Sequence, residues 1–223
     1  MKTIKTLLSA AALATVALAA APPAQACGGE WFAEPEIDYR VMGVARAEKS
    51  LERGDYDAAA GAIVRMIPHI RNYHGVTRDP IINRAMRVLA VATSRKGGEI
   101  NDKQLLSYAQ DGWQGGAASQ RNTNLEWSVN ALKALEDKDE TEDVLLQAQL
   151  AEAMTQVAEL RDDGKARLES LAKRDLLVSP EAYRRLASLR AAEGNTRGEL
   201  AALERCRNMT KDKNLCGAVE GHS

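Results

Sequence analysis

Few residues of this sequence have the type and spacing that catalysis or metal binding requires. The three histidines are His69, His74 and His222. His69 and His74 lie five residues apart across the end of an expected helix, on different faces, so they are unsuited to share a metal ion. The sequence contains neither HExxH nor GxSxG. We therefore expect no metal, no cofactor and no enzymatic activity. The alternative is an enzyme whose site is built between helices.

A run of carboxylates, EDKDETED, occupies residues 136–143 and raises the question of calcium binding. Its spacing lacks the alternating ligands and the central glycine of an EF-hand loop. Acidic side chains are also favourable in the first turn of a helix, where they complement the helix dipole. We interpret the run as a solvated turn before a helix, and Thr141 has the right chemistry to cap that helix.

The three cysteines are Cys27, Cys206 and Cys216. Residues 1–26 are typical of a secretory signal, with a lysine-containing start, an apolar run and an A-x-A cleavage site at 24–26. In an oxidising compartment, Cys206 and Cys216 are expected to form a disulfide that pins the C-terminal tail. Cys27 is then either acylated or a free thiol. We expect a periplasmic or secreted protein, with a lipoprotein anchored at Cys27 as the alternative.

Composition favours helices throughout the mature chain. Removal of residues 1–26 leaves about 197 residues with a net charge of about −3, which does not indicate a nucleic-acid binder. No second long apolar run follows, so no membrane span is predicted. Aromatic residues make up only 4% of the chain and Phe occurs once. Helices must therefore pack through small and aliphatic side chains, and the sequence predicts an all-α protein.

A helical hairpin is predicted for residues 39–68. Apolar and small residues recur there at helical spacing, stop at Gly54 and resume after Asp55 and Tyr56. Gly54 is suited to the turn, and Asp55 or Asp57 can cap the second helix. Weaker copies of the pattern end at Gly97, near Lys138, at Gly164 and at Gly194.

Two loops are expected between these hairpins. The first, at residues 74–80, ends with Pro80 placed to start the next helix. The second, at residues 111–124, is rich in Gly, Ser and Asn and is expected on the surface. Residues 139–161 contain no helix breaker, which allows two helices to be fused there. Ser179 followed by proline has the chemistry of a helix start.

The hairpins resemble the tetratricopeptide repeat, a helix-turn-helix unit of about 34 residues with a bulky residue, a Leu-small pair and a Gly-Asp-Tyr turn. The turn is matched at residues 54–56. The bulky, Leu and small positions are matched by Met86, Leu89 and Ala90, and again by Tyr183, Leu186 and Ala187. The resemblance implies an α-α helical-hairpin solenoid, wound as a right-handed superhelix of about four to five irregular hairpins. A generic α-α solenoid is the alternative.

The resemblance also implies a function, which is that of an exported scaffold or adaptor for a protein or peptide partner in the cell envelope. In tetratricopeptide proteins the first helix of each repeat lines a concave groove, at positions that correspond here to Arg84, Arg87 and Arg184. Arginines there would make a positive groove that holds carboxylates of a peptide. The alternative is that they are solvated residues paired with neighbours such as Glu181.

The expected organisation has four parts. Residues 1–26 form the signal peptide, 27–38 a flexible leader, 39–209 the tetratricopeptide-like domain and 210–223 the C-terminal tail.

Overall fold

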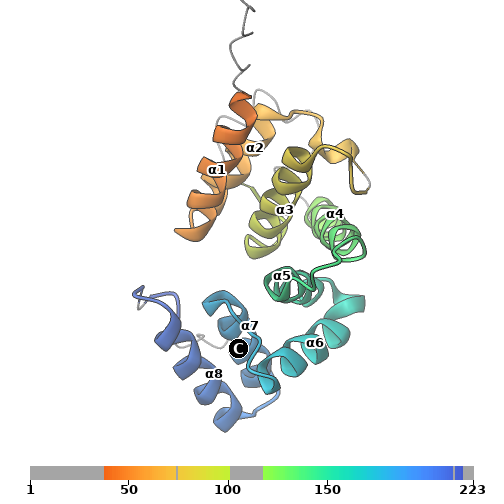
Figure 1. Cartoon of the computed structure of the whole chain (residues 1–223). Coiled ribbons are helices and arrows are strands. Elements are labelled where there is room, and N and C mark those ends of the chain that lie inside the picture. Colours follow the sequence, from red (N-terminus) through yellow and green to blue (C-terminus); the bar gives the residue numbers. More distant parts are fainter. Residues whose placement is uncertain (1–37, 74, 101–117, 213, 218–223) are drawn as a thin grey trace, which may run out of the picture. The chain divides into compact units, whose positions relative to one another are not determined.

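A computed structural model describes residues 38–73, 75–100, 118–212 and 214–217, and these residues form eight α-helices (Figure 1). The helices are α1 (Tyr39–Glu52), α2 (Tyr56–Met66), α3 (Pro80–Arg95), α4 (Ala118–Glu136), α5 (Val144–Met154), α6 (Arg161–Lys173), α7 (Pro180–Ala192) and α8 (Thr196–Met209). Two 3₁₀ turns, η1 (Ile70–Asn72) and η3 (Ala158–Leu160), accompany them. No strand occurs within the described ranges. The prediction of an all-α protein is confirmed.

Neighbouring helices pack in pairs along the chain. The pairs are α1 with α2, α3 with α4, α5 with α6 and α7 with α8. In addition, the first helix of each pair contacts the first helix of the next, so α1 packs on α3, α3 on α5 and α5 on α7 (Figure 1). This pattern is that of stacked helical hairpins, and the predicted α-α hairpin arrangement is confirmed. The right-handed superhelix and the tetratricopeptide family stay predictions.

Several helix ends follow the expected capping chemistry. Gly54 has a φ of 77°, which suits the turn between α1 and α2. The Asp55 carboxylate accepts a hydrogen bond from the Ala58 amide at 3.2 Å. Pro80 is the first residue of α3. The Ser179 hydroxyl accepts from the Ala182 amide at 3.0 Å and caps α7. These local predictions are confirmed. They could be made from the sequence because each depends on residues only a few positions apart.

The predicted start of the next helix at Thr141 is wrong, because Asp143 caps α5. The Asp143 carboxylate accepts a hydrogen bond from the Leu146 amide at 2.9 Å. Asp139 accepts from the amides of Thr141 at 2.9 Å and of Asp143 at 2.6 Å. An ionised carboxylate is a stronger acceptor than a hydroxyl, so the acidic run organises this turn and Thr141 becomes part of it.

The helices in residues 139–161 are separate, and the predicted helix end at Gly164 is wrong. The chain leaves α5 at Met154 and enters α6 at Arg161. Gly164 lies inside α6 and is buried against α5. A Cβ atom at this position would lie only 2.8 Å from the Ala151 carbonyl oxygen and 2.8 Å from the Met154 Cβ. The glycine therefore permits the close approach of α5 and α6. In the sequence alone, a glycine at this position indicated the end of a helix.

The predicted loop at residues 111–124 is wrong for residues 118–124, which belong to α4. The Thr123 hydroxyl donates to the Ser119 carbonyl at 3.0 Å. The buried Asn124 side chain donates from Nδ2 to the Gly98 carbonyl oxygen at 2.8 Å. These polar side chains find partners within and beyond the helix, so their usual preference for loops is overridden. The remaining loop residues lie outside the described ranges.

The buried apolar side chains form two clusters that meet at α5. The first cluster runs from α1 to α5, and the second from α5 to α8. Leu150 belongs to the first cluster and Ala151 to the second. Because α5 contributes to both, it connects the two halves of the array.

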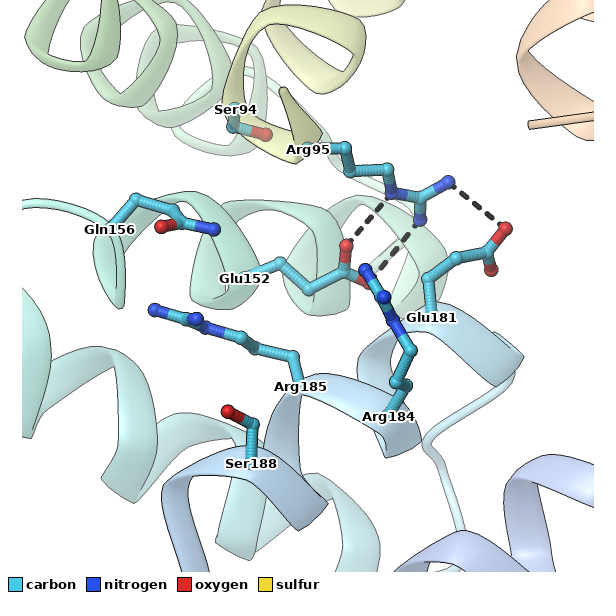
Figure 2. Close-up of a pocket in the computed structure, with 8 residues that line it drawn as sticks. All are labelled: Ser94, Arg95, Glu152, Gln156, Glu181, Arg184, Arg185 and Ser188. Carbon is cyan, nitrogen blue, oxygen red and sulfur yellow. Dashed lines mark hydrogen bonds and ion pairs between the residues drawn. The ribbon is translucent and has the colours of Figure 1, made fainter. Parts of the chain in front are cut away.

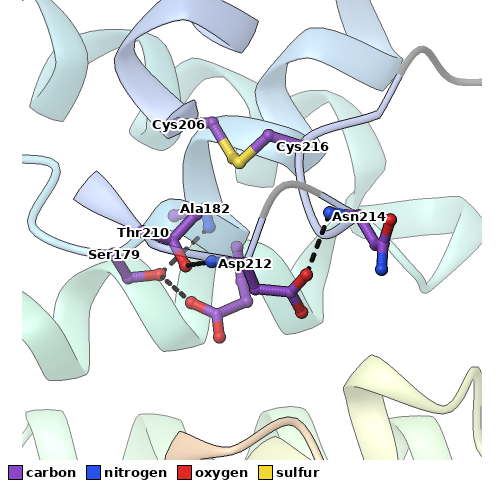
Figure 3. The surroundings of a disulfide bond; sticks show 8 residues. Ser179, Ala182, Cys206, Thr210, Asp212, Asn214 and Cys216 are labelled. Atoms are coloured by element: carbon purple, nitrogen blue, oxygen red, sulfur yellow. Dashed lines mark hydrogen bonds between the residues drawn. A yellow bond between two sulfur atoms is a disulfide. The ribbon is translucent and has the colours of Figure 1, made fainter. Parts of the chain in front are cut away.

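The C-terminal tail is tied to α8 by a disulfide between Cys206 and Cys216, whose Cα atoms are 5.8 Å apart (Figure 3). Both cysteines are fully buried. The Asp212 amide donates to the Thr210 hydroxyl at 3.0 Å, and the Asn214 amide donates to the Asp212 carboxylate at 2.9 Å (Figure 3). These turns bring Cys216 back towards the helix.

The predicted signal peptide and Cys27 lie outside the described residues, as do His74 and His222. Among the helices that the structure describes, none is long and apolar enough to cross a membrane.

Candidate functional site

A polar pocket of about 170 Å³ lies where α3, α5 and α7 meet, on the first helices of three successive hairpins (Figure 2). Its lining is rich in charged side chains and consists of Ser94, Arg95, Glu152, Gln156, Glu181, Arg184, Arg185 and Ser188. Since all of these residues except Gln156, which follows α5, come from the three helices, the pocket exists only when the hairpins are packed.

The buried part of the pocket is an ion-pair network centred on Arg95, at the end of α3. The Arg95 Nε donates to Glu152 of α5 at 3.0 Å, and its Nη1 lies 3.3 Å from a carboxylate oxygen of Glu181 of α7 (Figure 2). The side chains of Arg95 and Glu152 are only 8% and 6% exposed. Burial by itself would lower the pKa of Arg95, but the two carboxylates outweigh it and raise that pKa. The network thus joins three helices through ion pairs to Arg95.

Two further side chains complete this network. The Ser179 hydroxyl lies 3.2 Å from Glu152 and 3.2 Å from Glu181, while it also caps α7. The Arg95 guanidinium carbon lies 5.8 Å from the centre of the Tyr56 ring, in a cation–π contact. Burial raises the pKa of the Tyr56 hydroxyl. Both carboxylates are thus engaged in ion pairs and hydrogen bonds with residues of the protein. The arrangement is suited to fixing the helices.

Arg185 lies on the other side of the pocket and is bonded only to neutral groups. Its Nε donates to the Thr155 hydroxyl at 2.6 Å, and its Nη2 donates to the Thr155 carbonyl at 2.7 Å. Burial lowers the pKa of Arg185, as do the positive charges of Arg161 and Arg184, and the negative charge of Glu152 opposes this lowering without cancelling it. This half-buried cation forms no hydrogen bond or ion pair with a carboxylate within the part of the chain that the structure describes.

Arg184 is exposed at the rim of the pocket. In Figure 2 its guanidinium reaches towards Glu152, while that of Arg185 extends towards Gln156. Arg184 forms neither a hydrogen bond nor an ion pair with the described residues. The pocket lining as a whole holds three arginines and two glutamates, so it carries an excess positive charge.

The three arginines expected to share a groove do not meet at one site. Arg84 forms a two-point ion pair with Glu48, at 3.0 Å and 2.6 Å. Arg87 donates to Asp143 at 2.6 Å and to Gln149 at 2.7 Å. Only Arg184 lines the pocket. Arg84 and Arg87 are thus paired with neighbouring residues, as the alternative interpretation expects. Glu181, the neighbour named in that interpretation, pairs with Arg95 instead. A groove role for Arg84 and Arg87 stays a prediction.

Arg95, Glu152 and Arg185 were not predicted from the sequence as site residues. Arg95 lies eight residues after Arg87, on the same side of the helix, so helical periodicity gave a signal for it. Its partner Glu152 is 57 residues away in the chain. No local pattern links residues at that separation.

Within the described ranges, His, Cys, Asp and Glu side chains form no cluster of three or more suited to a metal ion.

No protein-family model matches the sequence, and searches of curated proteins and of solved structures gave no significant match. The functional argument therefore depends on the pocket and on the residues that line it.

Proposed function

We propose that this chain is an exported scaffold of tetratricopeptide-like hairpins that binds a protein or peptide partner in the cell envelope. The pocket between α3, α5 and α7 forms part of its binding surface. The observation that carries the proposal is Arg184, an exposed arginine at the rim of the pocket that is unpaired within the described chain. Arginine is enriched at protein interfaces and at their energetic hot spots.

The packing of the hairpins supports this role. The first helices of successive hairpins contact one another, so one side of the array presents side chains from several helices together. Repeat proteins of this kind commonly bind partners on such composite surfaces. The Arg95 network fixes α3, α5 and α7 beneath the pocket, which keeps a binding surface in one geometry before the partner arrives.

Export is supported by the signal-like residues 1–26 and by the disulfide between Cys206 and Cys216, since disulfides persist in oxidising compartments. The proposed location is periplasmic or secreted. The alternative is a structural envelope lipoprotein anchored at Cys27. Mass spectrometry of the mature protein distinguishes them, because an acyl group on Cys27 adds a defined mass and supports the lipoprotein.

Partner capture from an envelope extract tests the proposed function. The mature chain is compared with Arg184→Glu and with Arg197→Glu, which makes the same charge change at an exposed arginine of α8 outside the pocket lining. We expect Arg184→Glu to lose the partner and Arg197→Glu to retain it, with both variants folded by circular dichroism. Equal capture by all three proteins would place the binding surface away from the pocket.

A further inference from the structure

We infer that the pocket is a binding site for one carboxylate group, held by Arg185 and Arg184. This inference rests on the proposed function and names the chemistry that the partner presents. The starting point is the charge of the lining. Glu152 and Glu181 share Arg95 as their ion-pair partner. Arg184 and Arg185 form no ion pair within the described chain, so these two arginines give the lining its excess positive charge.

Arg185 is held in place before any ligand arrives. Thr155 fixes its Nε at 2.6 Å and its Nη2 at 2.7 Å. The remaining nitrogen, Nη1, makes no hydrogen bond to a described residue. A half-buried guanidinium without an ion-pair partner is unfavourable, because water is partly removed from the charge and the neutral oxygens of Thr155 replace that water only in part. An anion bound in the pocket supplies the missing charge.

The other side chains of the pocket indicate which anion fits. Gln156 and Ser188 line it and can donate neutral hydrogen bonds to an oxygen atom. Glu152 and Glu181 line it as well, and they repel a second negative charge. The lining has one more positive than negative charge. A carboxylate ion neutralises this excess, whereas a phosphate dianion would leave the pocket with a net negative charge. The volume of about 170 Å³ is also below the usual range of pockets that hold cofactors or nucleotides.

A carboxylate of this kind has three sources: the C-terminus of a peptide, an Asp or Glu side chain, or a free small acid. All three present the same two oxygens to Arg185 and Arg184. The probes are therefore sodium acetate, a short capped peptide with a free C-terminal carboxylate, its amidated form, and an amidated peptide with one internal aspartate. Inorganic phosphate and sodium chloride at equal ionic strength are the comparison anions.

Binding is measured by NMR through the Nε–H signal of Arg185 in the wild-type mature chain. We expect a saturable shift with acetate and with at least one of the carboxylate peptides, and none with chloride. Arg185→Met should weaken carboxylate binding at least about tenfold, because it removes charged hydrogen bonds to the ligand. The matched control, Arg197→Met on α8, should bind as the wild type does. The wild-type titration remains informative even if Arg185→Met fails to fold.

The inference is overturned if acetate shifts the Arg185 signal no more than chloride does, if phosphate binds more tightly than acetate, or if Arg185→Met retains wild-type affinity. Its failure is distinguishable from that of the proposed function. If carboxylates do not bind but Arg184→Glu still abolishes partner capture, only the ligand assignment is rejected. If carboxylates bind but Arg184→Glu leaves partner capture unchanged, the partner-binding role is rejected and the pocket is a site for a free small acid.

Discussion

Arg95 and Arg84 each pair with a glutamate, but in different surroundings. The Arg95 side chain is 8% exposed, whereas that of Arg84 is 46% exposed. An exposed pair contributes little to stability because water and salt screen it. A buried pair has lost its water, so the removal of one member leaves an uncompensated charge. The same residue type therefore has a structural role at one position of α3 and a minor one at another.

Replacement of Arg95 by Met should reduce the free energy of unfolding by about 3–5 kcal/mol, since Glu152 and Glu181 then remain buried without their cation. Arg84→Met is the matched control and should cost no more than about 1 kcal/mol. Urea unfolding followed by circular dichroism measures both. Equal losses for the two variants would show that the Arg95 network does not hold α3, α5 and α7 together.

At the scale of residues, the sequence analysis named Arg184, which lines the pocket, together with Arg84 and Arg87, which do not. Arg95 and Arg185 derive their roles from Glu152 and Thr155, which lie 57 and 30 residues away from them in the chain. Such pairs depend on how hairpins stack, and a single sequence does not contain that information.

At the scale of helices, the contact between α5 and α6 depends on Gly164. Ala151 and Met154 of α5 lie where a side chain at this position would be. Glycine is normally unfavourable inside a helix, by roughly 0.5–1 kcal/mol relative to alanine. Its presence in α6 is explained by the close packing of the two helices. Because the glycine is required by tertiary packing, the sequence pattern wrongly indicated a helix end at this position. The turn at Gly54, in contrast, followed from local residues alone.

Gly164→Ala should destabilise the protein by about 1–3 kcal/mol, because the added methyl group forces α5 and α6 apart. Gly43→Ala is the matched helical control. There the new Cβ meets only the flexible end of Met66, so the gain in helix propensity should leave stability unchanged or slightly higher. Thermal unfolding compares the two variants. A higher melting temperature for Gly164→Ala would contradict the packing role.

The disulfide between Cys206 and Cys216 should stabilise the last hairpin. Replacement of both cysteines by alanine removes a short covalent closure and should cost about 2–3 kcal/mol. Alkylation of the purified mature protein provides the direct test: these two thiols should become reactive only after unfolding and reduction. Three reactive thiols without reductant would show that the bond is absent.

At the scale of the whole protein, acid should weaken the fold through carboxylates that are held as ions. Hydrogen bonding to Arg190 lowers the pKa of Glu169. For Asp143, burial opposes the shift, but bonds from Arg87 and from the α5 amides outweigh it and lower the pKa. A folded-state pKa below the unfolded value contributes stability that is complete above the unfolded pKa and is lost as the pH falls.

The urea midpoint should therefore be nearly constant between about pH 5 and 7 and fall below about pH 4.5, where carboxyl groups begin to protonate in the unfolded chain. Glu169→Gln should show a smaller fall than the wild type, because one of the shifted groups is removed. A midpoint that stays constant down to about pH 3 would contradict this assignment.

The fold class of the whole protein was predictable because composition and helical periodicity extend along the entire mature chain. Small residues such as Ala90 and Ala187 were expected between aliphatic neighbours, and both are fully buried. The pocket was not predictable, since residues of several hairpins meet there. The excess charge of that pocket, centred on Arg184 and Arg185, became visible only in the folded arrangement.

The most direct test of partner binding at the pocket is the affinity of the captured partner, purified and titrated by calorimetry into the mature chain. The comparison is between the wild type, Arg184→Glu and Arg197→Glu, each shown to be folded. We predict that Arg184→Glu binds at least about tenfold more weakly and that Arg197→Glu binds as the wild type does, because only Arg184 borders the pocket. The same dissociation constant for all three proteins would contradict a binding surface at this pocket.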